Sequence, residues 1–246
     1  MLKVERVKYR FKDIVWKDFS LIVILIVSMI VFTLIGILFS FVYVDHLTEK
    51  IVLKLSVVIQ LLSYVVTVFS FYFLHIKDFK MHLKKNTAFI KQHYIFLIIV
   101  TIIMMVCSAI YNMTMQMLPD DIGFNETQNE LELMNLFDQP SFLPFTFLLI
   151  VIGAPLVEEI FFRHLLIGEL GKKFNTIVMG IISAILFSLM HVMGAESPFE
   201  IGSYIILAIA MVYAYIKSGC KLIASVSIHM LNNLISFIFT LITLYT

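Results

Sequence analysis

The chain has 246 residues, of which 61% are hydrophobic and only 14% are charged. Soluble domains are typically about half apolar and about a quarter charged, so this composition argues against an ordinary soluble domain. The net charge of +1 indicates no particular partner, and no nucleic-acid partner is expected. The apolar residues are concentrated in blocks of about twenty, the length with which a helix crosses a bilayer.

Seven such blocks follow one another and predict membrane-spanning helices. They cover residues 19–44, 51–75, 95–117, 142–170, 175–194, 201–216 and 222–244. Their apolar character is continuous and does not alternate, which excludes a strand-built barrel. The first block is too long for the apolar part of a signal peptide, so we expect a retained anchor. The predicted fold is an all-α, polytopic transmembrane helical bundle of about seven spans.

The basic residues between the blocks predict the orientation of the chain. Fifteen of the eighteen Lys and Arg residues lie on one side, in the N-terminal segment and after the second, fourth and sixth blocks. The segment 119–141 has six acidic residues and no basic ones, and it falls on the other side. Because cytoplasmic segments are rich in Lys and Arg, we expect a multi-pass cell-membrane protein with its N-terminus in the cytoplasm and its C-terminus outside.

Ionisable residues lie deep inside the fourth block, where they are energetically expensive. Glu158, Glu159 and Arg163 follow a Gly-Ala-Pro break at 153–155. Glu159 and Arg163 are four residues apart and share a helix face, whereas Glu158 is rotated by about 100°. One carboxylate can thus be neutralised while the other faces a cavity. The alternative is that both carboxylates share the arginine merely to hold helices together.

Two further polar pairs lie in other blocks. Phe187 and His191 are four residues apart in the fifth block, and so are His229 and Asn233 in the seventh. A lone histidine in an apolar helix is usually a packing residue, but two histidines, an asparagine and Glu158 on three spans favour a common site. Counting from the inner lysines places Glu158, His191 and His229 about 20, about 27 and about 12 Å deep. A common site therefore requires tilted helices or shifted helix ends.

The three motifs together resemble the signature of the CPBP family. They read Glu-Glu-x-x-x-Arg at 158–163, Phe-x-x-x-His at 187–191 and His-x-x-x-Asn at 229–233, each in its own span. That family comprises CAAX prenyl endopeptidases and bacteriocin-processing or self-immunity membrane proteins. The resemblance covers residues 142–246, which would form the catalytic helical core. Residues 19–141 would be accessory transmembrane helices with an acidic outer loop, and residues 1–18 a basic cytoplasmic segment.

The resemblance implies that Glu158 is the catalytic carboxylate and that His191 lies beside it. His229 and Asn233 would complete the site, supported by Glu159, Arg163 and Phe187. General chemistry agrees with these roles, because a carboxylate can act as the base that activates water. The amide of Asn233 and the ring of His229 can donate hydrogen bonds to a tetrahedral oxyanion.

The same residues also permit a metal site. Glu158, His191 and His229 could bind Zn²⁺ with water as the fourth ligand. Their spacing does not match His-Glu-x-x-His, and both glutamate-type and metal-dependent mechanisms have been proposed for the family. We favour a metal-free glutamate peptidase without a cofactor and keep zinc as the alternative. His164, which follows the arginine, is expected to line or pack and not to take part in catalysis.

The predicted function is an intramembrane endopeptidase, embedded in membrane lipids, that cleaves a small peptide or a lipidated protein. The resemblance suggests maturation of a secreted signalling peptide or bacteriocin, or self-immunity. One alternative is a non-catalytic scaffold that regulates a membrane sensor kinase. Another is a transporter, since intramembrane Glu, His and Arg also mark ion pathways. Transporters typically carry paired broken helices, and only the fourth block shows an obvious break.

Overall fold

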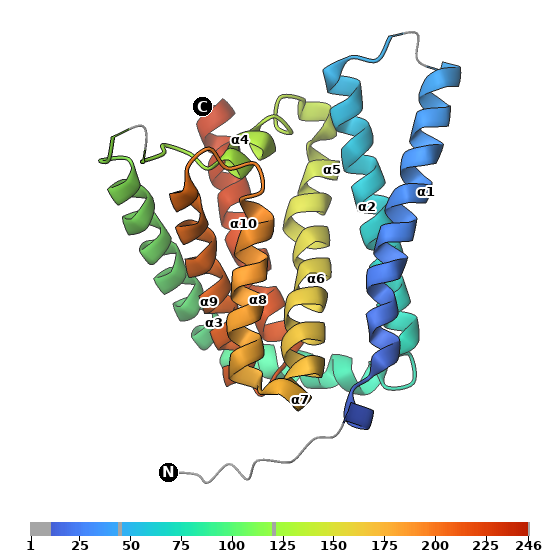
Figure 1. The fold of residues 1–246 in the computed structure, drawn as a ribbon, viewed down its shortest axis with the longest axis vertical. Coiled ribbons are helices and arrows are strands. Elements are labelled where there is room, and N and C mark those ends of the chain that lie inside the picture. The colour runs from blue at the N-terminus through green and yellow to red at the C-terminus, as the bar shows by residue number, and fades with distance from the viewer. Residues whose placement is uncertain (1–10, 44–45, 120–121, 246) are drawn as a thin grey trace.

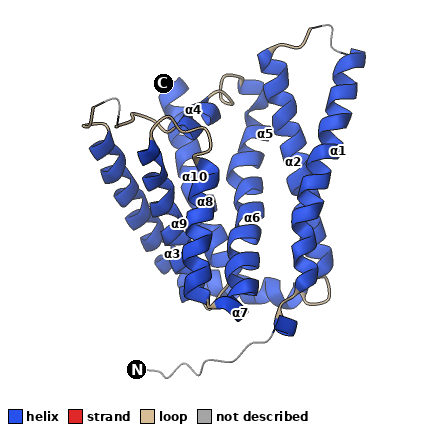
Figure 2. Ribbon diagram, in the orientation of Figure 1, coloured by secondary structure: helices blue, strands red, loops and turns tan. Residues whose placement is uncertain are grey.

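A computed structural model describes residues 11–43, 46–119 and 122–245. Over these residues the structure consists of helices and connecting loops and contains no strand (Figure 2). Six helical segments are long and apolar enough to cross a membrane, and a seventh apolar helix, Thr176–His191, is shorter. This confirms the predicted all-α bundle of about seven spans. Four basic residues of the N-terminal segment, from which the orientation was predicted, lie outside the described residues: Lys3, Arg6, Lys8 and Arg10.

The helices follow the chain in a simple order. Two short 3₁₀ turns, η1 (Phe11–Asp13) and η2 (Trp16–Phe19), lead into α1 (Ser20–Tyr43), α2 (Glu49–Leu74), α3 (Phe79–Met115) and the short α4 (Gln128–Met134). One long segment then combines η3 (Pro140–Phe142), α5 (Leu143–Phe147), η4 (Leu148–Gly153), α6 (Ala154–Glu159), η5 (Ile160–Leu170) and α7 (Gly171–Phe174). The described chain ends with α8 (Thr176–His191), η6 (Pro198–Glu200), α9 (Ile201–Lys217) and α10 (Leu222–Tyr245).

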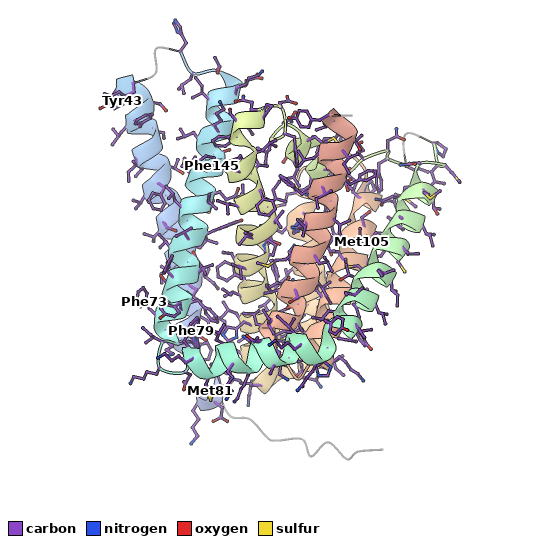
Figure 3. All side chains as sticks on the ribbon, turned by 180° about the vertical axis from the view of Figure 1, so that it is seen from behind. Tyr43, Phe73, Phe79, Met81, Met105 and Phe145 are labelled. Atoms are coloured by element: carbon purple, nitrogen blue, oxygen red, sulfur yellow. The ribbon has the colours of Figure 1, made fainter. Side chains whose placement is uncertain are left out.

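Helix α3 differs from the prediction, because it begins at Phe79, where a basic loop was expected. Its first part lies across the base of the bundle, and the rest rises along the bundle (Figures 1 and 3). The lysines of this stretch therefore lie on a helix. A helix that mixes basic residues with apolar ones such as Phe79 and Met81 suits the surface of a membrane.

The long segment 140–174 is not a regular α-helix. Two π-helical stretches, η4 and η5, lie on either side of α6. Pro155 contributes to this irregularity, because it has no backbone N–H to donate. The sequence predicted a break at 153–155 but not the π-helical turns. Such turns occur frequently at functional sites.

The core of the bundle lies among α3, α8, α9 and α10, with η5 packed against α8. Fully buried alanines, including Ala208, Ala214 and Ala224, allow the helices to approach closely. Helix α1 packs mainly on α2, and this pair forms one edge of the bundle (Figure 1). Helix α2 in turn contacts η4, α5 and α6. The helices α1 and α2 are therefore attached to the core through the long segment.

Residues 122–139 fold onto one end of the bundle (Figure 1). Helix α4 begins with a capping box, in which Thr127 and Glu130 bond each other's backbone. The carboxylate of Glu200 accepts a hydrogen bond from the backbone of Gln128 at 2.7 Å. The hydroxyl groups of Thr127 and Tyr204 are 2.8 Å apart. These contacts hold the acidic segment against the start of α9.

Candidate active site

The two adjacent glutamates at the end of α6 have different surroundings. Glu159 is fully buried, and its Oε1 lies 3.1 Å from Arg163 Nη1 and 3.0 Å from His229 Nδ1. The side chain of Glu158 is 12% exposed. Its Oε2 lies 3.8 Å from Nε2 of His191 and 3.8 Å from Nε2 of His229. The structure thus pairs one carboxylate with the arginine and turns the other toward both histidines.

The two 3.8 Å separations around Glu158 Oε2 are too long for direct hydrogen bonds. Each is suited to a bridging water, which could contact the carboxylate and a ring nitrogen at once. Within the part of the chain that the structure describes, this buried oxygen has no hydrogen-bond partner. A buried polar atom without a partner is destabilising. A water or a substrate group held here would therefore be stabilised by the carboxylate.

Both histidine rings are oriented by contacts at Nδ1. The Nδ1 of His191 is 2.8 Å from the carbonyl oxygen of Phe187, and the Nδ1 of His229 is 3.0 Å from Glu159 Oε1. A carbonyl and a carboxylate can only accept, so we assign the hydrogen to Nδ1 in both rings. In a neutral ring this leaves the lone pair of Nε2 directed toward Glu158.

Aromatic side chains support the histidines. Phe187 is fully buried, and its ring centroid is 4.3 Å from that of His191 and 5.8 Å from that of His229. The ring of Tyr204 stacks on His191 with centroids 4.9 Å apart. Phe187 was predicted from its spacing to His191, whereas Tyr204 was not predicted, because a tyrosine in an apolar helix carries no distinct signal. Through Thr127, Tyr204 also joins the histidine to the folded outer segment.

Arg163 lies completely buried beside the carboxylates. Its contact with Glu159 is close, but no nitrogen of the guanidinium has a well-aligned hydrogen-bond partner among the described residues. The guanidinium carbon lies 4.7 Å from the ring centroid of Phe187, which adds a cation–π contact. Arg163 is therefore held mainly by charge and by packing.

Asn233 links α10 to the π-helical stretch η4. Its Nδ2 donates a 2.9 Å hydrogen bond to the backbone carbonyl of Ile150, and its Oδ1 accepts from Asn232 at 3.1 Å. The predicted role of this amide is to donate a hydrogen bond to an oxyanion. One of its two N–H groups is used by Ile150, and the second can still donate. The observed contacts position the amide firmly.

The structure explains how residues of unequal predicted depth meet. Glu158 and His191 lie almost equally far along the chain from the turn at Asn175, so counting from the lysines exaggerated their difference. The ammonium of Lys221, just before α10, lies 4.9 Å from the ring centroid of Phe89 in α3. The contacts of His229 with Glu158 and Glu159 place its ring at the level of the two glutamates.

Helix α2 contributes residues that sequence analysis did not assign to the site. Tyr64 packs in one apolar cluster with Val157, the neighbour of Glu158, and the amide of Gln60 donates to the Tyr64 hydroxyl at 2.9 Å. Tyr64 and Gly153 also line a groove of about 210 Å³ between α2 and the long segment. The sequence signal that could have identified these residues is the spacing of Gln60 and Tyr64, a polar pair four residues apart in the second apolar block.

The donor atoms of Glu158, His191 and His229 are not gathered closely. Across the described ranges, the one group of three His, Cys, Asp or Glu residues whose ligand atoms all lie within 4.8 Å of one another is Asp18, His75 and His164. A tetrahedral zinc site holds its ligands at about 2.0–2.2 Å from the metal. The ligand atoms of Glu158, His191 and His229 would therefore have to move closer together to bind zinc.

A buried carboxylate and two oriented histidines thus lie together inside a membrane-spanning helical bundle, and such groups are suited to acid–base chemistry. Residues 140–235 match the family model of type II CAAX prenyl endopeptidase Rce1-like proteins. This match supports the resemblance of this part of the chain to the CPBP family of CAAX proteases, and the six apolar helices support a multi-pass membrane protein. Comparisons with curated proteins and with solved structures gave no match.

Proposed function

We propose that the chain is a glutamate-type intramembrane endopeptidase that cleaves a small peptide or a lipid-anchored protein without a catalytic metal. The observation that carries this proposal is the position of Glu158 Oε2, 3.8 Å from the Nε2 atoms of both histidines. The two rings are oriented by Phe187 and Glu159. A water between these groups could be deprotonated by the carboxylate of Glu158 and oriented by the two histidine rings.

The proposed reaction has two steps. Glu158, aided by His191, takes a proton from water, and the resulting hydroxide attacks the scissile carbonyl carbon. The second N–H of Asn233 and Nε2 of His229, when protonated, donate to the oxyanion. Protonated Glu158 then transfers its proton to the departing amine as the C–N bond breaks. Glu159 orients the ring of His229 and stabilises its positive charge when Nε2 is protonated.

The groove beside Tyr64 supports a lateral route for the substrate. It is lined by apolar side chains of α2 and of the long segment, and it opens between helices that would face lipid. The outer segment would block a substrate that approached the site from its end of the bundle, because Thr127 and Tyr204 tie this segment to the start of α9. A peptide with an apolar or lipidated part fits this route. Maturation of a secreted signalling peptide or bacteriocin, or self-immunity, is the proposed setting.

The distribution of lysines supports an orientation with the N-terminus in the cytoplasm. Helix α7, which carries Lys172 and Lys173, lies at the same end of the bundle as the start of α1 and the first part of α3 (Figure 1). Lysines concentrated at one end of a membrane bundle mark its cytoplasmic side. The C-terminal end of α10 lies at the opposite end and would face outward (Figure 1).

Purified protein in detergent tests the function. It is incubated with candidate precursor peptides from the same genome, and products are identified by mass spectrometry, with and without chelator. Cleavage that depends on Glu158 and survives chelation supports the proposal. If folded protein cleaves none of the plausible precursors, the scaffold that binds a sensor kinase becomes the better account.

His191→Ala is expected to slow cleavage by about 10²–10⁴-fold, the usual contribution of a positioned acid–base group. The side chain is partly exposed, so the variant should still insert and fold. Its matched control is His93→Ala, an exposed histidine of α3. Cleavage at the normal rate by His191→Ala would remove this residue from the site.

Val65→Trp is expected to slow cleavage of a membrane-anchored substrate several-fold, because the bulky indole side chain would fill the groove that Val65 lines. Val65 is 42% exposed, so the change should be tolerated by the fold. Val31→Trp on α1, where the valine is 45% exposed, is the control. Equal rates for both variants would argue against entry through this groove.

A further inference from the structure

A second cluster of ionisable side chains lies outside the Glu158 centre. Asp18 of η2, His75 at the end of α2 and His164 of η5 come from three separate segments. Oδ2 of Asp18 lies 2.7 Å from Nε2 of His164 and 3.3 Å from Nε2 of His75. One ligand atom from each residue lies within 4.8 Å of the other two. None of these three residues enters the proposed cleavage reaction.

We propose that Asp18, His75 and His164 form a binding site for a divalent transition-metal ion such as Zn²⁺. One carboxylate and two imidazoles are ligands that zinc accepts, with water or another group as the fourth. Around a tetrahedral ion with bonds of about 2.0–2.2 Å, ligand atoms are about 3.3–3.5 Å apart. The Asp18–His75 separation already has this length. Metal binding would replace the shorter hydrogen bond between Asp18 and His164.

Burial of Asp18 favours an ion over hydrogen bonds alone. Its side chain is fully buried, and its second oxygen, Oδ1, has no hydrogen-bond partner among the described residues. A buried carboxylate with an unsatisfied oxygen is costly unless a cation compensates it. The ammonium of the adjacent Lys17 is directed elsewhere, to the carbonyl oxygen of Leu74 at 2.7 Å.

The histidines are suited to the role of ligands. Nδ1 of His75 faces the carbonyl oxygen of Phe71 at 3.4 Å, which leaves Nε2 toward Asp18. Metal-bound histidines commonly donate their other ring N–H in this way. The side chains of His75 and His164 are 26% and 19% exposed, so an ion can reach them.

An ion at this site would join the α1–α2 pair to the long segment. The backbone N–H of Val15 already donates to Glu169 of η5 at 2.7 Å, so η2 and η5 are neighbours. Metal coordination would strengthen that contact at the base of the bundle. Loss of the ion would therefore loosen α2, which lines the groove beside Tyr64.

The test is a zinc titration of the full-length chain in detergent, freed of chelator and without a histidine tag. Calorimetry is expected to show one Zn²⁺ per chain, and saturation should raise the midpoint of thermal unfolding by several degrees. His75→Gln and His164→Gln should each weaken binding by at least about ten-fold. Mg²⁺ should not compete, because it prefers oxygen ligands.

Two variants serve as controls for the titration. His46→Gln, at an exposed histidine, and Glu158→Gln, at the proposed active site, should both bind zinc like the wild type. The proposal is overturned if the folded wild-type chain binds no zinc, or if both trio variants bind it normally. It is also overturned if Glu158→Gln abolishes binding while the trio variants retain it. Because the readout is binding, failure here is distinct from failure of the peptidase assignment.

Discussion

Glu158→Ala is expected to abolish cleavage, with a loss of about 10²–10⁴-fold or more, while leaving the protein folded and inserted. Oε2 of this carboxylate lies 3.8 Å from Nε2 of His191 and 3.8 Å from Nε2 of His229. Removing it eliminates the proposed base but does not break the buried pair of Glu159 and Arg163. The measurement is the cleavage rate of a precursor peptide, with the midpoint of thermal unfolding recorded in parallel.

The stability of the Glu158 variants provides an independent signature. A partly buried carboxylate with an unsatisfied oxygen is a destabilising feature, so Glu158→Gln should unfold at the same or a higher temperature than the wild type. Glu126→Gln, in the exposed outer segment, is the matched control and should change neither quantity. Normal turnover by Glu158→Ala would rule out this residue as the base. A strongly destabilised variant would instead indicate a structural role.

Arg163→Met is expected to lower the free energy of unfolding by about 3–5 kcal/mol, because it leaves the buried charge of Glu159 without its partner. Methionine retains much of the side-chain volume, so the effect isolates the charge. In a chain of this size the midpoint of thermal unfolding should fall by about 10 °C or more. Cleavage should fall as well, since Glu159 also orients His229.

A second change tests whether the loss comes from the stranded carboxylate. Arg163→Met combined with Glu159→Gln removes both charges and should recover a large part of the lost stability, although not the activity. Arg163→Lys keeps a cation and should be milder than Arg163→Met. If the double variant is no more stable than the single one, the arginine acts through packing on Phe187 and not through its charge.

The sequence allowed the bundle and its polar residues to be predicted for identifiable reasons. Apolar blocks must match the bilayer, and lysines must remain at its surface, so the spans and the basic ends were visible. The four-residue spacing of Glu159 and Arg163 likewise anticipated which carboxylate would be paired. The irregular backbone was not visible, because η4 and η5 arise from how the long segment packs and not from a local pattern.

Contacts between distant segments also escaped the sequence. Tyr204 and Tyr64 are ordinary aromatic residues of apolar helices, and their positions beside the site depend on how α9 and α2 pack. The contact of His164 with Asp18 joins residues 146 positions apart, which no spacing rule addresses. The first part of α3 was predicted as a loop, because its many lysines interrupt the apolar pattern. In the structure this part is a helix that lies along the base of the bundle.

The π-helical stretch η5 ties the chemistry of the site to the exact length of the chain. Each residue of a helix contributes a fixed part of a turn, so removing a single residue between Glu159 and Asn175 would rotate the glutamate pair relative to α8. The shortened segment would still be long enough to cross the bilayer. Its carboxylates, however, would no longer face both histidines. Related chains should therefore tolerate substitutions in η5 far better than insertions or deletions.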